Sequence, residues 1–287
     1  MSHLHETDVK RLESVANKLR QHVITSVAHA KSGHQGGPLG MADIFAVLYF
    51  HELHHRPKNP EWAERDRLIL SNGHICPVRY AAMAEAGYFP VKELMTLRQL
   101  GSRLQGHPER EKLPGSETTS GPLGAGLAQA VGLAYAARMD DKKWRTYCIT
   151  SDGEHEAGLH WEAVLFAGKY RLNNLISIVD RNYIQIDGKT EDIMPLDPLA
   201  DKYRAFNWQV IECNGNDIVD VARALEEAKS AHQNPVCIIA HTIPGRGVSY
   251  MENNYLWHSQ PFKPGEAEQA LEELRTIEKQ LKKDHHV

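Results

Sequence analysis

The chain of 287 residues is 41% hydrophobic and 24% charged, which is typical of a globular protein with one large core or two modest ones. Its net charge of −4 and its isoelectric point near 6.5, without a dense Lys/Arg block, exclude an electrostatic preference for nucleic acid or anionic lipid and favour small molecules or proteins as partners. No apolar run approaches the roughly 20 residues of a membrane span, and the start MSHLHETDVKRLE lacks the apolar core of a signal peptide, so we expect a cytoplasmic protein.

The first predicted helix covers 7–31, because apolar residues recur there at spacings of three and four before Gly33. Those apolar residues are Leu12, Val15, Leu19, Val23 and Val27. Further helical patterns cover 40–54, 76–87, 91–99, 125–139, 157–172, 217–232 and 265–283, and the β-rich runs between them are RLILS, RTYCITS, LISIVD, WQVIEC and VCIIAH.

Five apolar strands that alternate with helices predict an α/β fold, a parallel β-sheet flanked by helices on both faces. No repeat or linker divides the sequence, so we expect one domain over 1–287, ending in a charged helix and a frayed DHHV tail. The cysteines are widely separated and three lie in the strand runs, which predicts reduced core thiols rather than disulfides or metal ligands. They are Cys76, Cys148, Cys213 and Cys237.

The stretch HELHH, 51–55, fits the H-E-x-x-H template, in which two histidines one helical turn apart hold zinc. Arg56-Pro57 follows, and a proline disfavours helical geometry in the residue before it, so His55 is predicted at a helix end. No later residue stands out as a third zinc ligand. We expect a helix end and linker, at the surface or in a subunit contact, rather than a zinc site.

Ligands of parallel sheets bind at the carboxyl ends of the strands, so the residues after each strand are the place to look for chemistry. Asp152 follows the second run in a glycine-containing turn, and Asn182 follows the third. Two oxygen ligands on adjacent strand ends suit a hard cation such as Mg²⁺ that also holds a diphosphate. Gly153 would let the backbone approach the phosphate. Taken alone, an Asp-Gly pair is more typical of a plain turn.

An Asp-Gly followed by an Asn after the next apolar strand resembles the thiamine diphosphate motif of transketolase-like enzymes. Further segments resemble transketolase in the family's order: SGHQGGPLG (32–40), NPEWAERDRLILSNGH (59–74), RQLGSRLQGHPE (98–109), TTSGPLGAGLAQAVGLA (118–134) and GRGVSYMENNYLWH (245–258). The chain is therefore similar to the N-terminal, diphosphate-binding half of a transketolase. The resemblance implies the thiamine diphosphate-binding (PP-type) fold.

The resemblance also implies the ligands of the cation and the cofactor. Mg²⁺, or Ca²⁺ or Mn²⁺ in its place, would be bound by Asp152, the side chain of Asn182 and the carbonyl of Ile184. Thiamine diphosphate would be contacted by the Gly153 N–H and by matching positions elsewhere in the chain: His74, Gly121, Pro122, Leu123, Asn182 and His258.

Four histidines, His34, His74, His107 and His258, match family histidines that converge on the cofactor and the sugar. His107 matches the one that contacts the C1 hydroxyl and carbonyl oxygen of the donor, His34 and His258 match those near the scissile C2–C3 bond, and His74 lies beside the diphosphate. Imidazoles suit proton transfer in both directions. The implied reaction moves a two-carbon ketol unit from a ketose to an aldose, with the cofactor as electron sink.

In this family, a second, pyrimidine-binding domain provides the glutamate that activates the cofactor. It also provides most of the residues that bind the distal phosphate of the sugar. The sequence shows no such domain. The resemblance therefore implies a separate C-terminal subunit, an α2β2 assembly with the cofactor at the interface, and no activity of this chain alone. The donor is expected to be a ketose phosphate or another anionic sugar, including branched-chain and sulfonated sugars.

Two departures from the family pattern are Ser151, where the motif usually has Gly, and Ala157, where a glutamate near the dimer interface is usual; Glu156 stands one place earlier. Residues that could shape acceptor choice, or simply pack, are His241, Arg246, Tyr250, Tyr255 and Trp257. Alternatives are a component of a 2-oxo acid dehydrogenase or deoxyxylulose phosphate synthase, which the four histidines and GHPE disfavour, or a non-catalytic regulatory half-enzyme, which the intact metal ligands disfavour.

Overall fold

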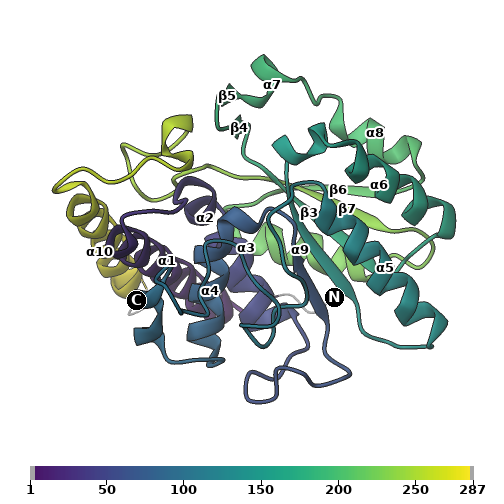
Figure 1. The fold of residues 1–287 in the computed structure, drawn as a ribbon, viewed down its shortest axis with the longest axis horizontal. Coiled ribbons are helices and arrows are strands. Elements are labelled where there is room, and N and C mark those ends of the chain that lie inside the picture. Colours follow the sequence, from purple (N-terminus) through teal and green to yellow (C-terminus); the bar gives the residue numbers. More distant parts are fainter. Residues whose placement is uncertain (1–3, 285–287) are drawn as a thin grey trace.

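A computed structural model describes residues 4–284, so the last residues of the predicted DHHV tail lie outside the described part. Its centre is a five-stranded sheet in the order β1-β2-β3-β7-β6, in which every pairing is parallel (Figure 1). The strands are β1 Arg67–Leu70, β2 Thr146–Ser151, β3 Leu175–Arg181, β6 Gln209–Asn214 and β7 Val236–His241. The five predicted runs and their parallel arrangement are confirmed.

Both faces of the sheet are apolar, because alternate residues of each strand enter different cores. In β2, Tyr147 and Ile149 belong to one cluster and Cys148 to the other. The first cluster packs against α1 Glu6–Ala30, α3 Ala42–Val47, α4 Cys76–Ala86 and α9 Ile218–Lys229, with α10 Glu266–Asp284 lying along α1 (Figure 1). The second packs against α5 Ala125–Met139, α6 Gly158–Tyr170 and α8 Leu199–Ala205.

Helix boundaries differ from the prediction mainly around 36–54 and 91–99. The helical region begins earlier than expected, with α2 Gly36–Gly40, and closes with a π-helix at Leu48–Glu52. The segment 91–99 is only a 3₁₀ helix, Val91–Thr96. Sequence reasoning also missed a small hairpin, β4 Ile184–Gln185 with β5 Gly188–Lys189, and two short helices, α7 Thr190–Ile193 and α8 Leu199–Ala205, because elements this short carry little or no periodicity.

The HELHH stretch lies at a helix end, as predicted. The π-helix ends at Glu52 and Leu53 is extended, so no helical turn joins His51 to His55. The His55 ring bonds to the Tyr49 carbonyl and the Tyr88 hydroxyl, each at 2.9 Å. The end of the stretch is therefore anchored by hydrogen bonds to Tyr49 and Tyr88 rather than simply exposed.

All four cysteines are buried and free, which confirms the expectation of core thiols. Among residues 4–284, no helix combines the length and apolar character that a membrane span requires.

Candidate active site

Asp152 lies in the turn after β2, with its carboxylate fully buried. Its Oδ1 accepts from the Gly153 N–H at 2.8 Å, and its Oδ2 accepts from the Tyr183 N–H at 2.7 Å and from Arg181 Nη1 at 3.3 Å. Burial raises the pKa of Asp152 to about 6, although Arg181 and the two N–H groups favour the charged form. These donors favour the charged carboxylate, which is the form that binds a cation.

Asn182 directly follows β3, beside the Asp152 turn. Its Nδ2 donates to Asp180 Oδ2 at 2.9 Å, and Asp180 also accepts from the Thr242 hydroxyl. These contacts fix the amide, so that Asn182 Oδ1, which accepts from the Ile184 N–H at 3.0 Å, is the atom left for a cation. Such orienting partners are typical around metal ligands.

The predicted donor set fits a hard divalent cation. It comprises the carboxylate of Asp152, the amide oxygen of Asn182 and the carbonyl of Ile184, all oxygen atoms of the kind that Mg²⁺ and Ca²⁺ prefer. The sheet brings them together, because Ser151 lies opposite Asp180 in the β2–β3 register.

The four predicted histidines come from four separate segments and meet in one cluster. The ring centroid of His34 is 5.1 Å from that of His74, 5.2 Å from His258 and 6.4 Å from His107. His74 and His258 are 5.0 Å apart. His74 lies in a 3₁₀ helix after β1, and His258 in another, Tyr255–His258. The segment after His34 also reaches the cation region, because a Cβ on Gly37 would lie 3.8 Å from Asp180 Oδ2.

Burial favours the neutral form of these histidines. It lowers the pKa of His34 to about 3, helped by His258, Arg98 and His107. Burial likewise lowers the pKa of His74, of His107 and of His258. A neutral imidazole offers one N–H donor and one bare nitrogen, so the cluster can both orient hydroxyl groups and accept a proton.

Buried polar atoms without partners mark the space between the histidines and the glycine-rich loop, residues 121–124. Within residues 4–284, Asn72 Oδ1 and Nδ2, Ser120 Oγ and His34 Nδ1 are buried and lack a hydrogen-bond partner. Gly121 borders open space, with nothing within 4 Å of a Cβ added there, and Leu123 beside it is 46% exposed. Orphaned polar groups of this kind call for a polar ligand. The residues therefore fit a diphosphate cofactor with a polar ring system.

Several residues that sequence reasoning missed support this site. Arg181 is buried and bonds to Asp152, Glu191 and Asp197. Asp180, whose pKa burial raises to about 7, orients Asn182. The available signal was the pair of charged residues at the end of the apolar strand run LISIV, since charged residues are rarely buried without partners.

The two departures from the family pattern have different surroundings. Ser151 ends β2 and is buried. Ala157 faces the glycine-rich loop, since a Cβ added to Gly124 would lie 2.5 Å from the Cβ of Ala157. Glu156 instead is exposed and accepts a 2.7 Å hydrogen bond from Gln185, so in this chain its carboxylate does not occupy the place of Ala157.

Of the five residues considered for acceptor choice, His241 contacts the loop after β3. Its Nδ1 lies at a hydrogen-bonding distance of 2.7 Å from the Tyr183 hydroxyl. Arg246 contacts Glu252 at the surface. The other three lie in 250–257: the Tyr250 hydroxyl donates to the Glu266 carbonyl, Trp257 is buried beside Tyr250 and Phe262, and Tyr255 is partly exposed.

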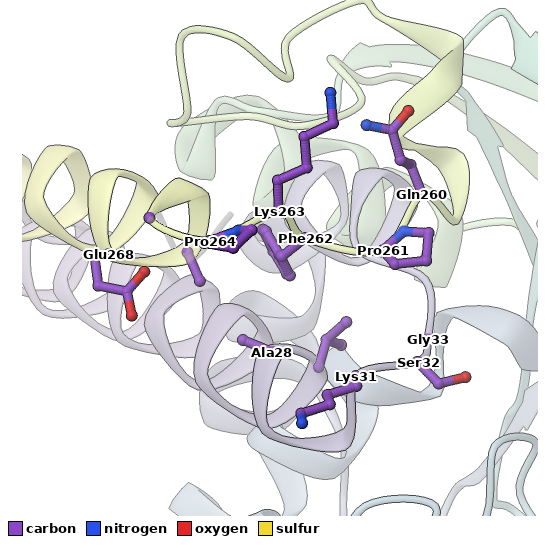
Figure 2. Close-up of a pocket in the computed structure, with 13 residues that line it drawn as sticks. Ala28, Lys31, Ser32, Gly33, Gln260, Pro261, Phe262, Lys263, Pro264 and Glu268 are labelled. Carbon is purple, nitrogen blue, oxygen red and sulfur yellow. The ribbon is translucent and has the colours of Figure 1, made fainter.

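A pocket of about 380 Å³ lies between the end of α1 and the loop that follows His258 (Figure 2). Ser32, Gly33 and Gln260 connect its wall to the histidine segments. Figure 2 shows Lys31 and Lys263 pointing to opposite sides, so the two ammonium groups do not converge on an anion.

Comparison with known proteins agrees with this geometry. Residues 12–280 match the family described as transketolase, thiamine diphosphate binding domain. The chain is 42% identical over 248 residues to a 6-deoxy-6-sulfo-D-fructose transketolase subunit of Clostridium sp. (strain MSTE9), covering 86% of this chain and 90% of that protein. It is 36% identical over 278 residues to an apulose-4-phosphate transketolase subunit of Phocaeicola vulgatus, covering 97% and 99%.

Among solved structures, transketolase from Leishmania mexicana superposes with a TM-score of 0.84 at 34% sequence identity, over 95% of this chain and 45% of that one. The chain thus spans nearly all of two transketolase subunits and less than half of a longer transketolase chain. It belongs to the transketolase family and is the thiamine diphosphate-binding unit of that enzyme.

Proposed function

We propose that this chain is the N-terminal subunit of a split transketolase, which transfers a two-carbon ketol unit from an anionic ketose to an aldose with thiamine diphosphate and Mg²⁺. The observation that carries the proposal is the meeting of four neutral histidines with an oxygen donor set at the carboxyl ends of β1, β2 and β3. Strand ends of parallel sheets are the usual ligand sites, and the chain forms one diphosphate-binding domain around this edge.

The cation and diphosphate are held by the turn after β2 and the loop after β3. Asp152, Asn182 Oδ1 and the Ile184 carbonyl bind Mg²⁺. Gly153, whose N–H donates to Asp152 Oδ1 at 2.8 Å, and His74 lie beside the diphosphate. The Gly121-Pro122-Leu123 segment borders the rings of the cofactor. Bound there, thiamine diphosphate supplies the electron sink for cleavage of the ketose C2–C3 bond.

The histidine cluster binds and deprotonates the sugar. His107, the exposed member, contacts the C1 hydroxyl and carbonyl oxygen of the donor. His34 and His258 lie where the C3 hydroxyl loses its proton as the C2–C3 bond breaks. Burial lowers the pKa of both rings, so each ring is neutral near pH 7 and keeps a bare nitrogen that can accept a hydrogen bond from that hydroxyl.

A separate C-terminal subunit with the pyrimidine-binding domain completes the site in an α2β2 assembly. Support comes from exposed apolar side chains on α5, α6 and the loop before them: Leu123, Met139, Leu159, Leu165 and Phe166. An exposed apolar face of this kind marks an interaction surface. Free buried thiols support a cytoplasmic location for the assembly.

The direct test is reconstitution. The chain is assayed for ketol transfer alone and with the candidate C-terminal subunit, in the presence of thiamine diphosphate and Mg²⁺. Activity should require both subunits, and ketoses with a terminal phosphate or sulfonate should be preferred over neutral ketoses, because the related subunits are named for anionic sugars. Full turnover by the chain alone would contradict the split assembly.

A further inference from the structure

A buried chain of polar groups connects the Asp152 turn to helix α8. His155 Nδ1 lies 2.8 Å from the Ser151 carbonyl and 3.1 Å from the Asp152 carbonyl. His155 Nε2 lies 2.8 Å from the Tyr203 hydroxyl, which also lies 2.8 Å from His160 Nε2. His155 is 2% exposed, and Tyr203 and His160 are 0% exposed. Among the described residues, His160 Nδ1 is buried without a hydrogen-bond partner, so the chain of hydrogen bonds ends at His160.

The two carbonyl groups fix the direction of this chain. A carbonyl can only accept, so His155 Nδ1 carries the proton and, in a neutral ring, Nε2 is an acceptor. The Tyr203 hydroxyl therefore donates to His155 Nε2, and its oxygen accepts from the N–H at His160 Nε2. The bare Nδ1 of His160 then faces the buried Glu154 carboxyl, 4.0 Å away. The hydrogen bonds run one way, from α6 through α8 to the Asp152 turn.

We propose that His155, Tyr203 and His160 form a positioning relay that holds the Ser151–Asp152 backbone where the Asp152 carboxylate can bind the divalent cation. The inference rests on the proposed function, because it assigns a role to three residues outside the reacting cluster. None of the three is among the residues proposed to contact sugar or cofactor, and they act through the Ser151–Asp152 backbone.

The local contacts explain why the turn needs such an anchor. The Asp152 carboxylate bridges the two loops of the cation site, through the Gly153 N–H on its own turn and the Tyr183 N–H on the other. A shift of the Asp152 backbone would disturb both contacts at once. The relay links that backbone to α8 through the hydrogen bond between His155 and Tyr203. The Trp161 Nε1–H of α6 donates to the His155 carbonyl at 2.7 Å, which adds a direct link to α6. Partners of metal ligands commonly change metal affinity 10–100-fold.

The test uses Tyr203→Phe, which removes only the hydroxyl group, in the full chain reconstituted with its C-terminal partner. The dissociation constant of Mn²⁺ is measured by electron paramagnetic resonance at saturating thiamine diphosphate, and the KM for Mg²⁺ and kcat are measured in parallel. We expect Tyr203→Phe to weaken Mn²⁺ binding about 10-fold and to raise the KM for Mg²⁺, with kcat at saturating Mg²⁺ nearly unchanged.

Two variants of His155 separate the hydrogen bond from packing. Asn can place its amide N–H near the position of imidazole Nδ1–H, so His155→Asn should recover most of the Mn²⁺ affinity that His155→Leu loses. If His155→Leu does not fold, the Tyr203→Phe measurement still decides the matter.

The matched control is Tyr147→Phe. Tyr147 is equally buried on β2, and its hydroxyl donates to Glu52 at 2.7 Å on the other face of the sheet. It should lower stability without changing Mn²⁺ affinity. Wild-type affinity in Tyr203→Phe, or an equal loss in Tyr147→Phe, would overturn the relay. Failure of the wild-type assembly to bind Mn²⁺ with thiamine diphosphate would instead refute the proposed function, and the relay with it.

Discussion

Asp152 is the residue on which the cation site depends. Its carboxylate is fully buried and accepts three hydrogen bonds, one from its own turn and two from the end of β3 and the loop after it. The four histidines depend in a similar way on burial, which holds them neutral. Both groups show the same physical principle: the protein sets the charge state of a side chain by what surrounds it.

Replacing Asp152 by Asn should abolish cation binding while leaving the fold intact. Asn keeps the shape but removes the negative charge, and the loss in Mn²⁺ affinity should exceed about 100-fold, since partners of metal ligands alone account for 10–100-fold. Mn²⁺ titration of the assembly measures this. Asp201→Asn, at an exposed position on α8, is the control and should bind normally. Near-normal binding in Asp152→Asn would remove Asp152 from the ligand set.

His34 should make the chain sensitive to acid. Its pKa is lowered to about 3 in the folded state from 6.5, so the unfolded state binds more protons between these values, and stability falls as pH decreases from about 6.5 towards 3. In His34→Asn the slope of the unfolding free energy against pH should decrease, by an amount that corresponds to at most one proton taken up on unfolding. Urea unfolding at several pH values measures the slope. An unchanged slope would mean that His34 titrates normally.

Two glycines of helix α2, Gly36 and Gly40, allow it to pack closely against other segments of the backbone. A Cβ on Gly36 would lie 2.9 Å from the Trp257 carbonyl, and one on Gly40 would lie 2.9 Å from the Ile243 carbonyl. These close approaches hold the His34 segment against the segment that bears His258. Backbone atoms cannot easily give way, so the glycines are needed for contact between elements far apart in sequence.

Gly36→Ala should therefore destabilise the chain by about 1–3 kcal/mol, which is typical of overpacking, and should also lower activity by displacing His258 from His34. Thermal unfolding of the isolated chain measures the first effect. The control is Gly132→Ala in α5, where nothing lies within 4 Å of the new Cβ. It should be neutral or stabilising by about 0.5–1 kcal/mol, because Ala favours helix. Equal destabilisation by the two substitutions would exclude the close contact as the cause.

At the scale of the whole molecule, the two faces of the sheet differ in what covers them. Helix α10 forms an outer layer over α1 on one face (Figure 1). On the other face, α5 and α6 expose Met139, Leu165 and Phe166. The carboxyl ends of the strands, where the site lies, are between these layers. A partner on the α5–α6 side could therefore reach both the glycine-rich loop and the histidines.

Leu165→Glu should weaken assembly with the C-terminal subunit at least about 10-fold, because a charge placed in an apolar interface is not paired. Leu165 is 56% exposed, so the stability of the isolated chain should change by no more than about 0.5 kcal/mol. Sedimentation velocity of mixed subunits measures association. Val219→Glu, at a 53% exposed position on α9, is the control on the opposite face. The same loss with Val219→Glu would rule out a specific α5–α6 interface.

The sequence by itself determined the sheet, most of the long helices and the residue types of the site, because periodicity and strand-end motifs are local signals. Asp152 and Asn182 could be named from their positions after apolar runs. The family resemblance predicted that four histidines from distant segments converge, and the tertiary structure gave the distances between their ring centroids, 5.0 to 6.4 Å for the pairs in contact. Only the tertiary structure decided the bonds from Asp180 to Asn182 and from His155 to Tyr203, since contacts that depend on how the chain folds back leave no spacing in the sequence.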